Sequence, residues 1–272
     1  MTLLESSITS VQNARVKAWA QLLDKKGRDK QGQFIIEGEH LVQEALESGA
    51  AIETLVVAED RQHELPDGLL KQAVDAGIEC IAVSEQVLAK CTDTLTPQAA
   101  FAVLSKLDWS LDDFMRADSV GLVVVIDGIQ DPGNLGTIIR SADAVGATGV
   151  LLGRGTVDLY NPKTVRSTMG SLFHLPIVQG DLRDALPQAA SQGIAIVTTS
   201  LQGKRSCYEY DFRQPVWFVV GNEGQGVSAE VSALATEHIL IPMQGRAESL
   251  NAAMAATVVL FEAMRQRGTS KN

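Results

Sequence analysis

Hydrophobic and polar positions alternate between helical and strand periods along most of this chain. In the first hundred residues a helical period covers 11–23. Short apolar runs there predict strands at 34–37, 55–58, 78–83 and 101–104. Further on, similar runs predict strands at 122–126, 149–152, 194–198, 216–220 and 239–242. Helical patterns cover 134–145 and 250–265, and the stretch between 152 and 194 is rich in turn residues. This alternation predicts an α/β protein with a mostly parallel sheet and helices on both of its faces.

A break in the pattern divides the chain into two predicted domains. The stretch 108–119 is charged and has no strong period, which is typical of a linker. We therefore expect a small α/β domain over 1–107, a linker over 108–118, and a second α/β domain over 119–272.

Length and composition exclude several classes of protein. The chain has 272 residues, of which 45% are hydrophobic, so it can bury a core. Its longest apolar stretches, 122–126 and 252–260, fall short of the roughly 20 residues that cross a bilayer. The N-terminus lacks the pattern of a secretory signal, so we expect a cytoplasmic protein without a membrane span.

Cysteine and histidine spacings argue against disulfides and metal. Cys80, Cys91 and Cys207 are few, odd in number and far apart, so they form neither a disulfide framework nor a CxxC site. The four histidines show no HExxH or other ligand spacing. We expect no metal cofactor.

The charge balance gives two opposing indications about nucleic acid. A formal net charge of −10 argues against RNA or DNA as a partner. The segment 15–30 is nevertheless locally basic, and its candidates for phosphate contacts are Lys25, Lys26 and Arg28. Taken alone, this segment could equally be a solvated helix face and loop.

Three loops that follow predicted strands carry the candidate chemistry. They are 127–136, 221–226 and 242–251, and all are rich in Gly, Pro or Asx residues. Ligands of parallel sheets bind beyond the carboxyl ends of strands, so these loops are expected to form a site. Neither a GxGxxG dinucleotide fingerprint nor a GxxxxGK[ST] P-loop is present. The polar residues in or near the loops are Asn134, Arg140, Glu223, Ser249 and Asn251.

Together these loops resemble the three ordered motifs of the SpoU/TrmH family of knotted methyltransferases. The motifs are 131–136 through Arg140, 221–226, and 241–243 through 249–251, within a resemblance that spans about 120–267. The stretch 161–176 also resembles the family. The run from Asn13 through Glu37-Gly38 to Glu44 looks like the substrate-binding domain often fused to it.

The resemblance implies a fold, a cofactor and an assembly. The fold would be a C-terminal trefoil-knotted α/β methyltransferase domain, preceded by a small L30e-like α/β domain. Members bind S-adenosylmethionine between the knot loops and act as homodimers whose active site is completed across the interface. By motif, the residues implied to contact the cofactor are Gly221, Ile241 and Leu250, with Thr198 and Ser200 as weaker candidates.

The implied reaction is transfer of a methyl group to a ribose 2′-hydroxyl of RNA. Arg140 would have the central role, either as the base or, as its high pKa favours, as the group that orients the hydroxyl and stabilises alkoxide charge. Asn134, Asn251, Ser249 and Glu223 would position groups around it. Each has a structural alternative: Asn134 and Ser249 as helix caps, and Glu223 as a turn residue.

Alternatives to this function remain open on sequence grounds. A knotted RNA-binding protein that has lost catalysis would be expected to lack one of the polar residues above, and all are present. A small-molecule methyltransferase would not need the basic segment or the first domain. Ribosomal RNA is the expected substrate class and transfer RNA the alternative, with Lys163 and Arg166 as further candidates for holding RNA.

Overall fold

The computed structural model describes residues 4, 6–115, 121–200 and 203–268. Residues 116–118 of the expected linker lie outside this part. The chain forms two compact units. Unit 1 comprises Met1–Asp108 and Asp158–Phe173, and unit 2 comprises Trp109–Val157 and His174–Asn272. The domain limits 1–107, 108–118 and 119–272 stay a prediction. In the structure, Asp158–Phe173 packs with unit 1, although its neighbours on both sides belong to unit 2.

Unit 1 is built on a mixed five-stranded sheet of order β1-β4-β3-β5-β2. Its strands are β1 (Ser6–Ile8), β2 (Gln33–Glu37), β3 (Ile52–Ala58), β4 (Glu79–Val83) and β5 (Ala100–Ser105). Strands β1, β4 and β3 are parallel, whereas β5 runs antiparallel to β3 and β2.

Helices cover this sheet. They are α1 (Ala14–Gln21), α2 (Lys25–Gln31), α3 (Glu39–Glu47), η1 (Glu59–Glu64), α4 (Leu69–Asp75), α5 (Glu85–Cys91), α8 (Pro162–Thr168) and η2 (Ser171–Phe173). The core includes Trp19 of α1 packed edge-on against Phe101 of β5, with 5.7 Å between ring centroids.

Unit 2 contains a seven-stranded sheet of order β10-β12-β9-β11-β6-β7-β8, in which every described pairing is parallel. Its strands are β6 (Leu122–Asp127), β7 (Gly149–Leu152), β8 (Ile177–Gln179), β9 (Ala195–Thr199), β10 (Arg205–Ser206), β11 (Val216–Gly221) and β12 (Glu237–Leu240). The predicted α/β class with a mostly parallel sheet is confirmed. The trefoil knot and the L30e-like topology stay predictions from the resemblance.

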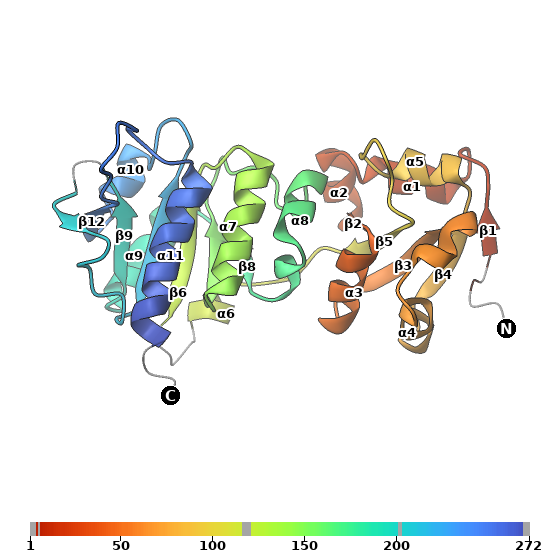
Figure 1. Ribbon diagram of the computed structural model, residues 1–272, viewed down its shortest axis with the longest axis horizontal. Coiled ribbons are helices and arrows are strands. Elements are labelled where there is room, and N and C mark those ends of the chain that lie inside the picture. The colour runs from red at the N-terminus through yellow and green to blue at the C-terminus, as the bar shows by residue number, and fades with distance from the viewer. Residues whose placement is uncertain (1–3, 5, 116–120, 201–202, 269–272) are drawn as a thin grey trace. The chain divides into compact units, whose positions relative to one another are not determined.

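The helices of unit 2 lie on both faces of its sheet (Figure 1). They are α6 (Asp112–Met115), α7 (Pro132–Ala144), α9 (Leu182–Ser191), α10 (Ala229–Ser232) and α11 (Ala252–Gly268). Helices α7 and α11 lie side by side, joined by a 2.8 Å hydrogen bond between the Ser141 and Thr257 hydroxyls. Val123 and Val125 pack with α9, so the alternate residues of β6 point toward the α7 and α11 side.

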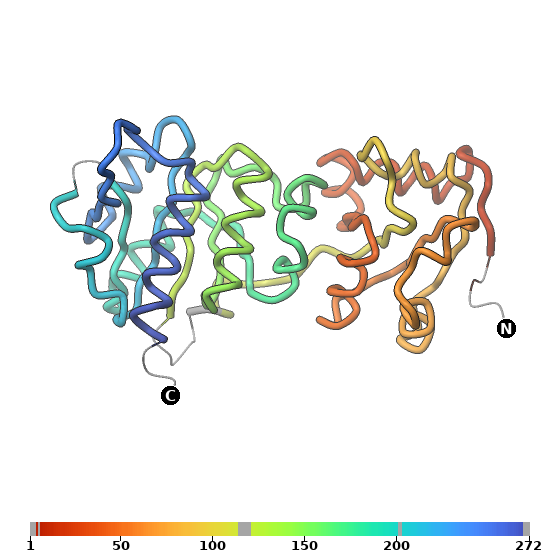
Figure 2. The backbone as a smooth tube through the Cα atoms, viewed as in Figure 1, coloured from red at the N-terminus to blue at the C-terminus, as the bar shows by residue number. Residues whose placement is uncertain are grey.

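The segment between β7 and β8 was expected to consist of turns, and it contains α8 and η2. Figure 2 lets the reader follow the chain out of the seven-stranded sheet after β7 and back into it at β8. Strands β8 and β10 and helices α9 and α10 were not predicted either. Both strands are very short, and α9 contains Pro187, which obscures its helical pattern.

Candidate functional site

The first two predicted loops meet at the carboxyl edge of the sheet in unit 2. Strand β11 pairs with β6 in a register that sets Gly221 opposite Asp127, so the loops that follow these strands begin side by side. The Asn222 side chain spans them and donates a 2.8 Å hydrogen bond from Nδ2 to the Gly128 carbonyl. Sequence reasoning did not single out Asn222, although its place beside Glu223 in the motif was a signal.

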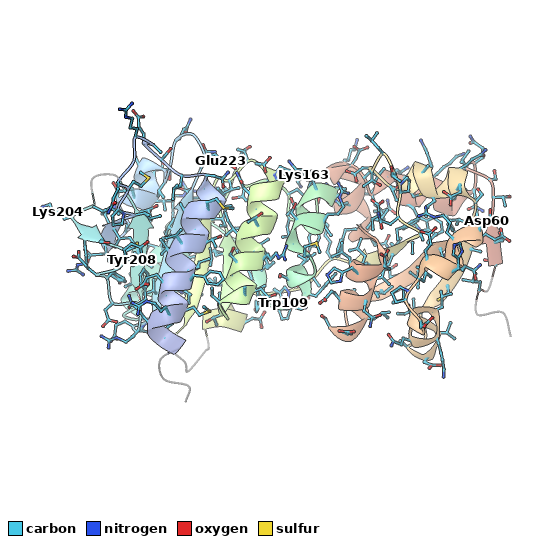
Figure 3. All side chains as sticks on the ribbon, in the orientation of Figure 1. Asp60, Trp109, Lys163, Lys204, Tyr208 and Glu223 are labelled. Carbon is cyan, nitrogen blue, oxygen red and sulfur yellow. The ribbon has the colours of Figure 1, made fainter. Side chains whose placement is uncertain are left out.

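Glu223, which is labelled in Figure 3, joins the second loop to the first through hydrogen bonds. Its Oε1 accepts hydrogen bonds from the Asp131 backbone N–H at 2.9 Å and from Asn134 Nδ2 at 3.0 Å. Its Oε2 accepts from the Gln130 N–H at 3.1 Å. Partial burial would raise the pKa of Glu223, but the hydrogen bonds from Asn134, Asp131 and Gln130 outweigh it and lower the pKa below the ordinary value. Glu223 is therefore an ionised acceptor at neutral pH.

Asn134 and Asn251 extend this connection to the third loop. Asn251 Nδ2 donates to Asn134 Oδ1 at 3.0 Å. Asn251 Oδ1 also accepts from the Ala253 and Met254 backbone N–H groups at 2.9 and 3.2 Å, so Asn251 caps α11. The chain Glu223–Asn134–Asn251 therefore links all three loops; we call it the polar triad.

The helix caps in the structure differ from those expected from the sequence. Asp131 caps α7 by accepting from the Asn134 N–H at 2.9 Å, so the Asn134 side chain is available for the polar triad. The expectation that Ser249 caps the last helix is wrong, because α11 begins at Ala252 and its cap is Asn251. Ser249 is exposed and forms no hydrogen bond with the described residues.

A cavity of about 630 Å³ opens beside the polar triad in unit 2. The five predicted cofactor residues all line it: Thr198, Ser200, Gly221, Ile241 and Leu250. Glu223 and Ser249 line it as well. The sequence analysis missed one wall, formed by Ala252, Ala255 and Ala256 of α11. Their i, i+3, i+4 spacing of small residues was the available signal.

Gly221 lies where the backbone folds back on itself. Asn222 and Gly226 exchange two 2.9 Å backbone hydrogen bonds, and the turn they close returns the chain over Gly221. A Cβ atom at position 221 would lie 2.1 Å from the Val227 nitrogen, so no other residue fits. Because Gly221 has no side chain, its backbone atoms form part of the cavity wall.

Arg140 does not join the other predicted catalytic residues. It lies on the exposed face of α7, does not line the cavity, and forms no hydrogen bond or ion pair within the described part of the chain. Its guanidinium is therefore available to a group from outside this chain.

The predicted RNA contacts fall in unit 1, and they differ in accessibility. Lys25, Lys26 and Lys163 are exposed, although Lys25 pairs with Asp29 at 2.5 Å. The prediction for Arg28 is contradicted. Its side chain is only 3% exposed, because Nε and Nη2 donate to Asp158 Oδ2 at 3.0 and 2.6 Å. A phosphate cannot reach a guanidinium that is enclosed in this way.

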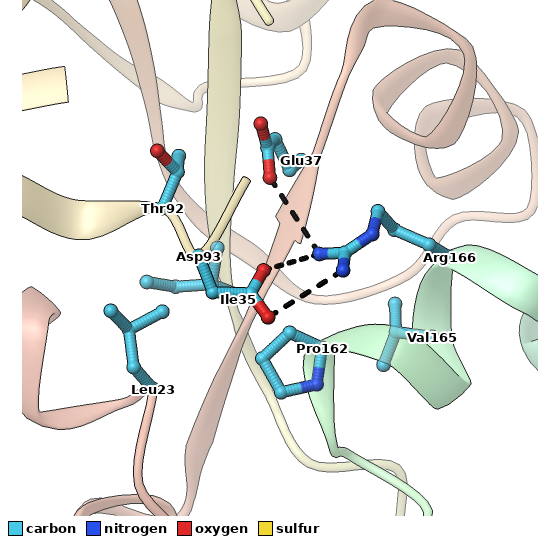
Figure 4. Close-up of a pocket in the computed structure, with 8 residues that line it drawn as sticks. All are labelled: Leu23, Ile35, Glu37, Thr92, Asp93, Pro162, Val165 and Arg166. Carbon is cyan, nitrogen blue, oxygen red and sulfur yellow. Dashed lines mark hydrogen bonds and ion pairs between the residues drawn. The ribbon is translucent and has the colours of Figure 1, made fainter. Parts of the chain in front are cut away.

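Arg166 is also engaged, in a small cavity of unit 1 (Figure 4). Its guanidinium hydrogen-bonds to Asp93, and its Nη1 lies 3.7 Å from Glu37 Oε2. The side chain is one-third exposed. Arg166 therefore already has two carboxylate partners.

The three cysteines are buried as free thiols, and burial raises the pKa of Cys91 to about 12. Within the described residues, no three His, Cys, Asp or Glu side chains are grouped so that they could hold a metal ion. None of the helices in that part is both long and apolar enough to cross a membrane.

Comparisons with known proteins match both parts of the chain to known families. The SpoU rRNA Methylase family matches residues 121–261, and the MRM3-like substrate binding domain matches residues 13–102. The chain is 38% identical to the 23S rRNA (guanosine(2553)-2′-O)-methyltransferase RlmP of Bacillus subtilis, with 93% of this chain and 97% of that protein covered. It is 37% identical to the 23S rRNA (uridine(2479)-2′-O)-methyltransferase of Streptomyces viridochromogenes, with 96% and 92% covered.

A solved structure is similar over almost the whole chain. The SpoU methyltransferase AviRb from Streptomyces viridochromogenes, in complex with the cofactor AdoMet, matches with a TM-score of 0.85 and 34% sequence identity. The match covers 95% of this chain and 99% of that one.

Proposed function

Because this chain belongs to the SpoU rRNA methylase family, we propose that it transfers a methyl group from S-adenosylmethionine to a ribose 2′-hydroxyl of ribosomal RNA. The observation that carries the proposal is the polar triad at the rim of the cavity in unit 2. The relatives RlmP and the uridine methyltransferase, which match over almost their whole length, support ribosomal RNA as the substrate class.

The cavity fits S-adenosylmethionine in size and chemistry. Its volume of about 630 Å³ lies within the range of small-molecule sites. Gly221 brings bare backbone to the wall, while Ile241 and Leu250 supply apolar contacts. These residues would hold the cofactor, as the relative solved with AdoMet supports.

When bound, the cofactor supplies a sulfonium methyl group open to in-line attack by an oxygen. The protein must then hold the ribose hydroxyl in line and stabilise the charge that develops on its oxygen. The polar triad fixes the three loops relative to one another, so the cavity keeps its shape as the substrate enters. Arg140 orients the hydroxyl and stabilises the alkoxide, because arginine is already protonated at neutral pH and cannot readily accept the hydroxyl proton, which passes to solvent.

The exposed position of Arg140 fits a homodimer. Met254, Phe261 and Met264 form an apolar row on the outer side of α11, with exposed fractions of 50%, 43% and 36%. A large apolar row on one helix is uncommon on an isolated protein surface. We assign it to the contact with a second copy, which covers the exposed sides of α7 and α11 and receives Arg140 beside its own cavity.

Sedimentation of single variants tests this assembly. Phe261→Glu should give a monomer, because a carboxylate in a buried apolar contact is strongly unfavourable. Leu95→Glu is the matched control, since Leu95 is fully exposed and lies in unit 1. A dimeric Phe261→Glu protein would exclude this interface.

Methyl transfer itself is measured with labelled S-adenosylmethionine and purified RNA. Ribosomal RNA depleted of this modification should accept label at one ribose 2′-oxygen, which ribose-methylation mapping then locates. Label on transfer RNA alone would change the substrate class. A folded dimer that binds the cofactor and labels neither RNA would be a binding module. We propose the cytoplasm as the place of this reaction.

A further inference from the structure

Residues Asp158–Phe173 belong to unit 1 although they lie between two strands of unit 2 in the sequence. We call them the docking segment. They contain the motif 161–167 and helix α8, which the sequence analysis assigned to the methyltransferase domain. Two arginines hold the segment in unit 1, and both had been candidates for RNA contacts.

Arg28 binds the beginning of the docking segment. Besides its two hydrogen bonds to Asp158, its Nη1 donates to the Leu22 and Leu23 carbonyls at 2.7 and 2.8 Å, just beyond the end of α1. The Asp158 side chain is 10% exposed. The guanidinium therefore joins α1, α2 and the docking segment in one buried contact.

Arg166 binds the other end of α8. It pairs with Asp93, which is 37% exposed, and faces Glu37, whose side chain is 4% exposed. Glu37 Oε1 accepts from Thr94 and from the Gln98 N–H, whereas Oε2 has no hydrogen-bond partner among the described residues. If Arg166 turned away to a phosphate, a buried carboxylate would lose the cation that faces it, at a high cost.

The same contacts hold the first turns of α2 and α8, each of which carries an exposed lysine. Leu23 and Pro162 line one cavity of about 10 Å³, room for about one water molecule, so α2 and α8 begin near each other. Lys26 lies in the first turn of α2, and Lys163 lies in the first turn of α8. Both are exposed.

We propose that Arg28 and Arg166 are positioning residues for RNA. They hold the docking segment so that Lys163 and Lys26 present their ammonium groups to one RNA backbone, and neither arginine touches a phosphate. This inference rests on the proposed RNA substrate.

Removing the Asp158 carboxylate distinguishes a positioning role of Arg28 from a purely electrostatic effect on RNA binding. Asp158→Asn makes unit 1 less negative, so electrostatics alone predicts tighter RNA binding. Positioning predicts weaker binding, because Arg28 loses its ionic partner and the segment shifts. At 0.1 M salt each lost phosphate contact costs about 5- to 8-fold in affinity, and the salt slope falls by about 0.7 to 0.9. S-adenosylmethionine affinity should stay unchanged, since its cavity lies in unit 2.

Two further variants make the test decisive. Asp93→Asn weakens the hold on Arg166 at a partly exposed position, so it should fold even if Asp158→Asn does not, and it should also bind RNA more weakly. Asp24→Asn is the control: Asp24 is exposed, precedes Lys25 and makes no capping bond. It should bind RNA at least as tightly as the unchanged protein.

The outcomes separate this inference from the proposed function. If the unchanged protein methylates RNA while Asp93→Asn and Asp158→Asn bind it as tightly as Asp24→Asn, the positioning role is overturned. If the unchanged protein neither binds nor methylates RNA, the proposed function fails instead.

Discussion

Replacing Glu223 with Gln tests whether the polar triad shapes the active loops. The carboxylate accepts three hydrogen bonds of 2.9 to 3.1 Å, two at Oε1 and one at Oε2. In the variant, the amide oxygen can take the Oε1 position. The amide NH₂ then faces the Gln130 N–H, and because both groups are donors, they form no hydrogen bond. The best geometry keeps two hydrogen bonds and loses their charge assistance.

The expected loss follows from those contacts. Exchanging a charge-assisted for a neutral hydrogen bond costs about 1 kcal/mol at each of two contacts, and losing the third costs at least as much, which gives about 3 kcal/mol without screening. Glu223 is exposed to water, which screens its charge, so the lower end of the expected loss is about 1.5 kcal/mol. If the loops must keep this shape in the transition state, kcat/KM should fall about 10- to 100-fold.

Methyl transfer and unfolding are both measured for this variant. The pKa of Glu223 is lowered in the fold, so its stabilisation is complete above the ordinary pKa of 4.5 and is lost as the pH falls through the lowered value. The stability difference from the Gln variant should therefore shrink below pH 4.5. Glu230→Gln removes the same charge from an exposed position on α10 and should leave kcat/KM unchanged. Unchanged transfer by Glu223→Gln would refute the role of the triad.

Three further changes test other parts of the molecule. Gly221→Ala should abolish S-adenosylmethionine binding in calorimetry, because its Cβ would lie 2.1 Å from the Val227 nitrogen, whereas Gly224→Ala should bind normally, since its nearest contact is 3.7 Å. Arg140→Ala should slow methyl transfer on the order of 100-fold at unchanged cofactor affinity; a parallel loss of cofactor binding would make Arg140 structural. Alanines at Lys25 and Lys26, the two exposed candidates of the basic segment, should lower the slope of log affinity against log salt by about 1.4 to 1.8, and an unchanged slope would mean that α2 is a solvated face without phosphate contacts.

Local patterns in the sequence were sufficient for most of unit 2. Continuous apolar runs predicted β6 and β7 closely, because strands buried on both faces need apolar residues throughout. Helix α9 was missed, although Leu182, Ala185, Leu186 and Ala189 follow the helical spacing and are buried. Pro187 obscured that spacing, and packing against the sheet stabilises the helix nonetheless.

The candidate cofactor residues were chosen because the loops resemble the SpoU/TrmH motifs, and all five line the cavity. The hydrogen bonds between the three loops could not be predicted from the sequence. Asp131 and Asn134 are both good capping residues, and only the fold shows that Asp131 caps α7 while Asn134 bridges Glu223 and Asn251. Hydrogen bonds between residues about ninety or more positions apart depend on strand register, which local pattern does not encode.

By itself, the sequence determined the α/β class and the three loops, since these depend on periodicity and on residue types at strand ends, and the resemblance of the loops to a family indicated five residues of the cavity wall. Only the tertiary structure decided which basic residues are free. Arg28 and Lys26 are two positions apart in one basic segment, yet one is enclosed by Asp158 and two carbonyls and the other is exposed. The partner that buries Arg28 lies 130 positions away and reaches it only when the docking segment packs into unit 1.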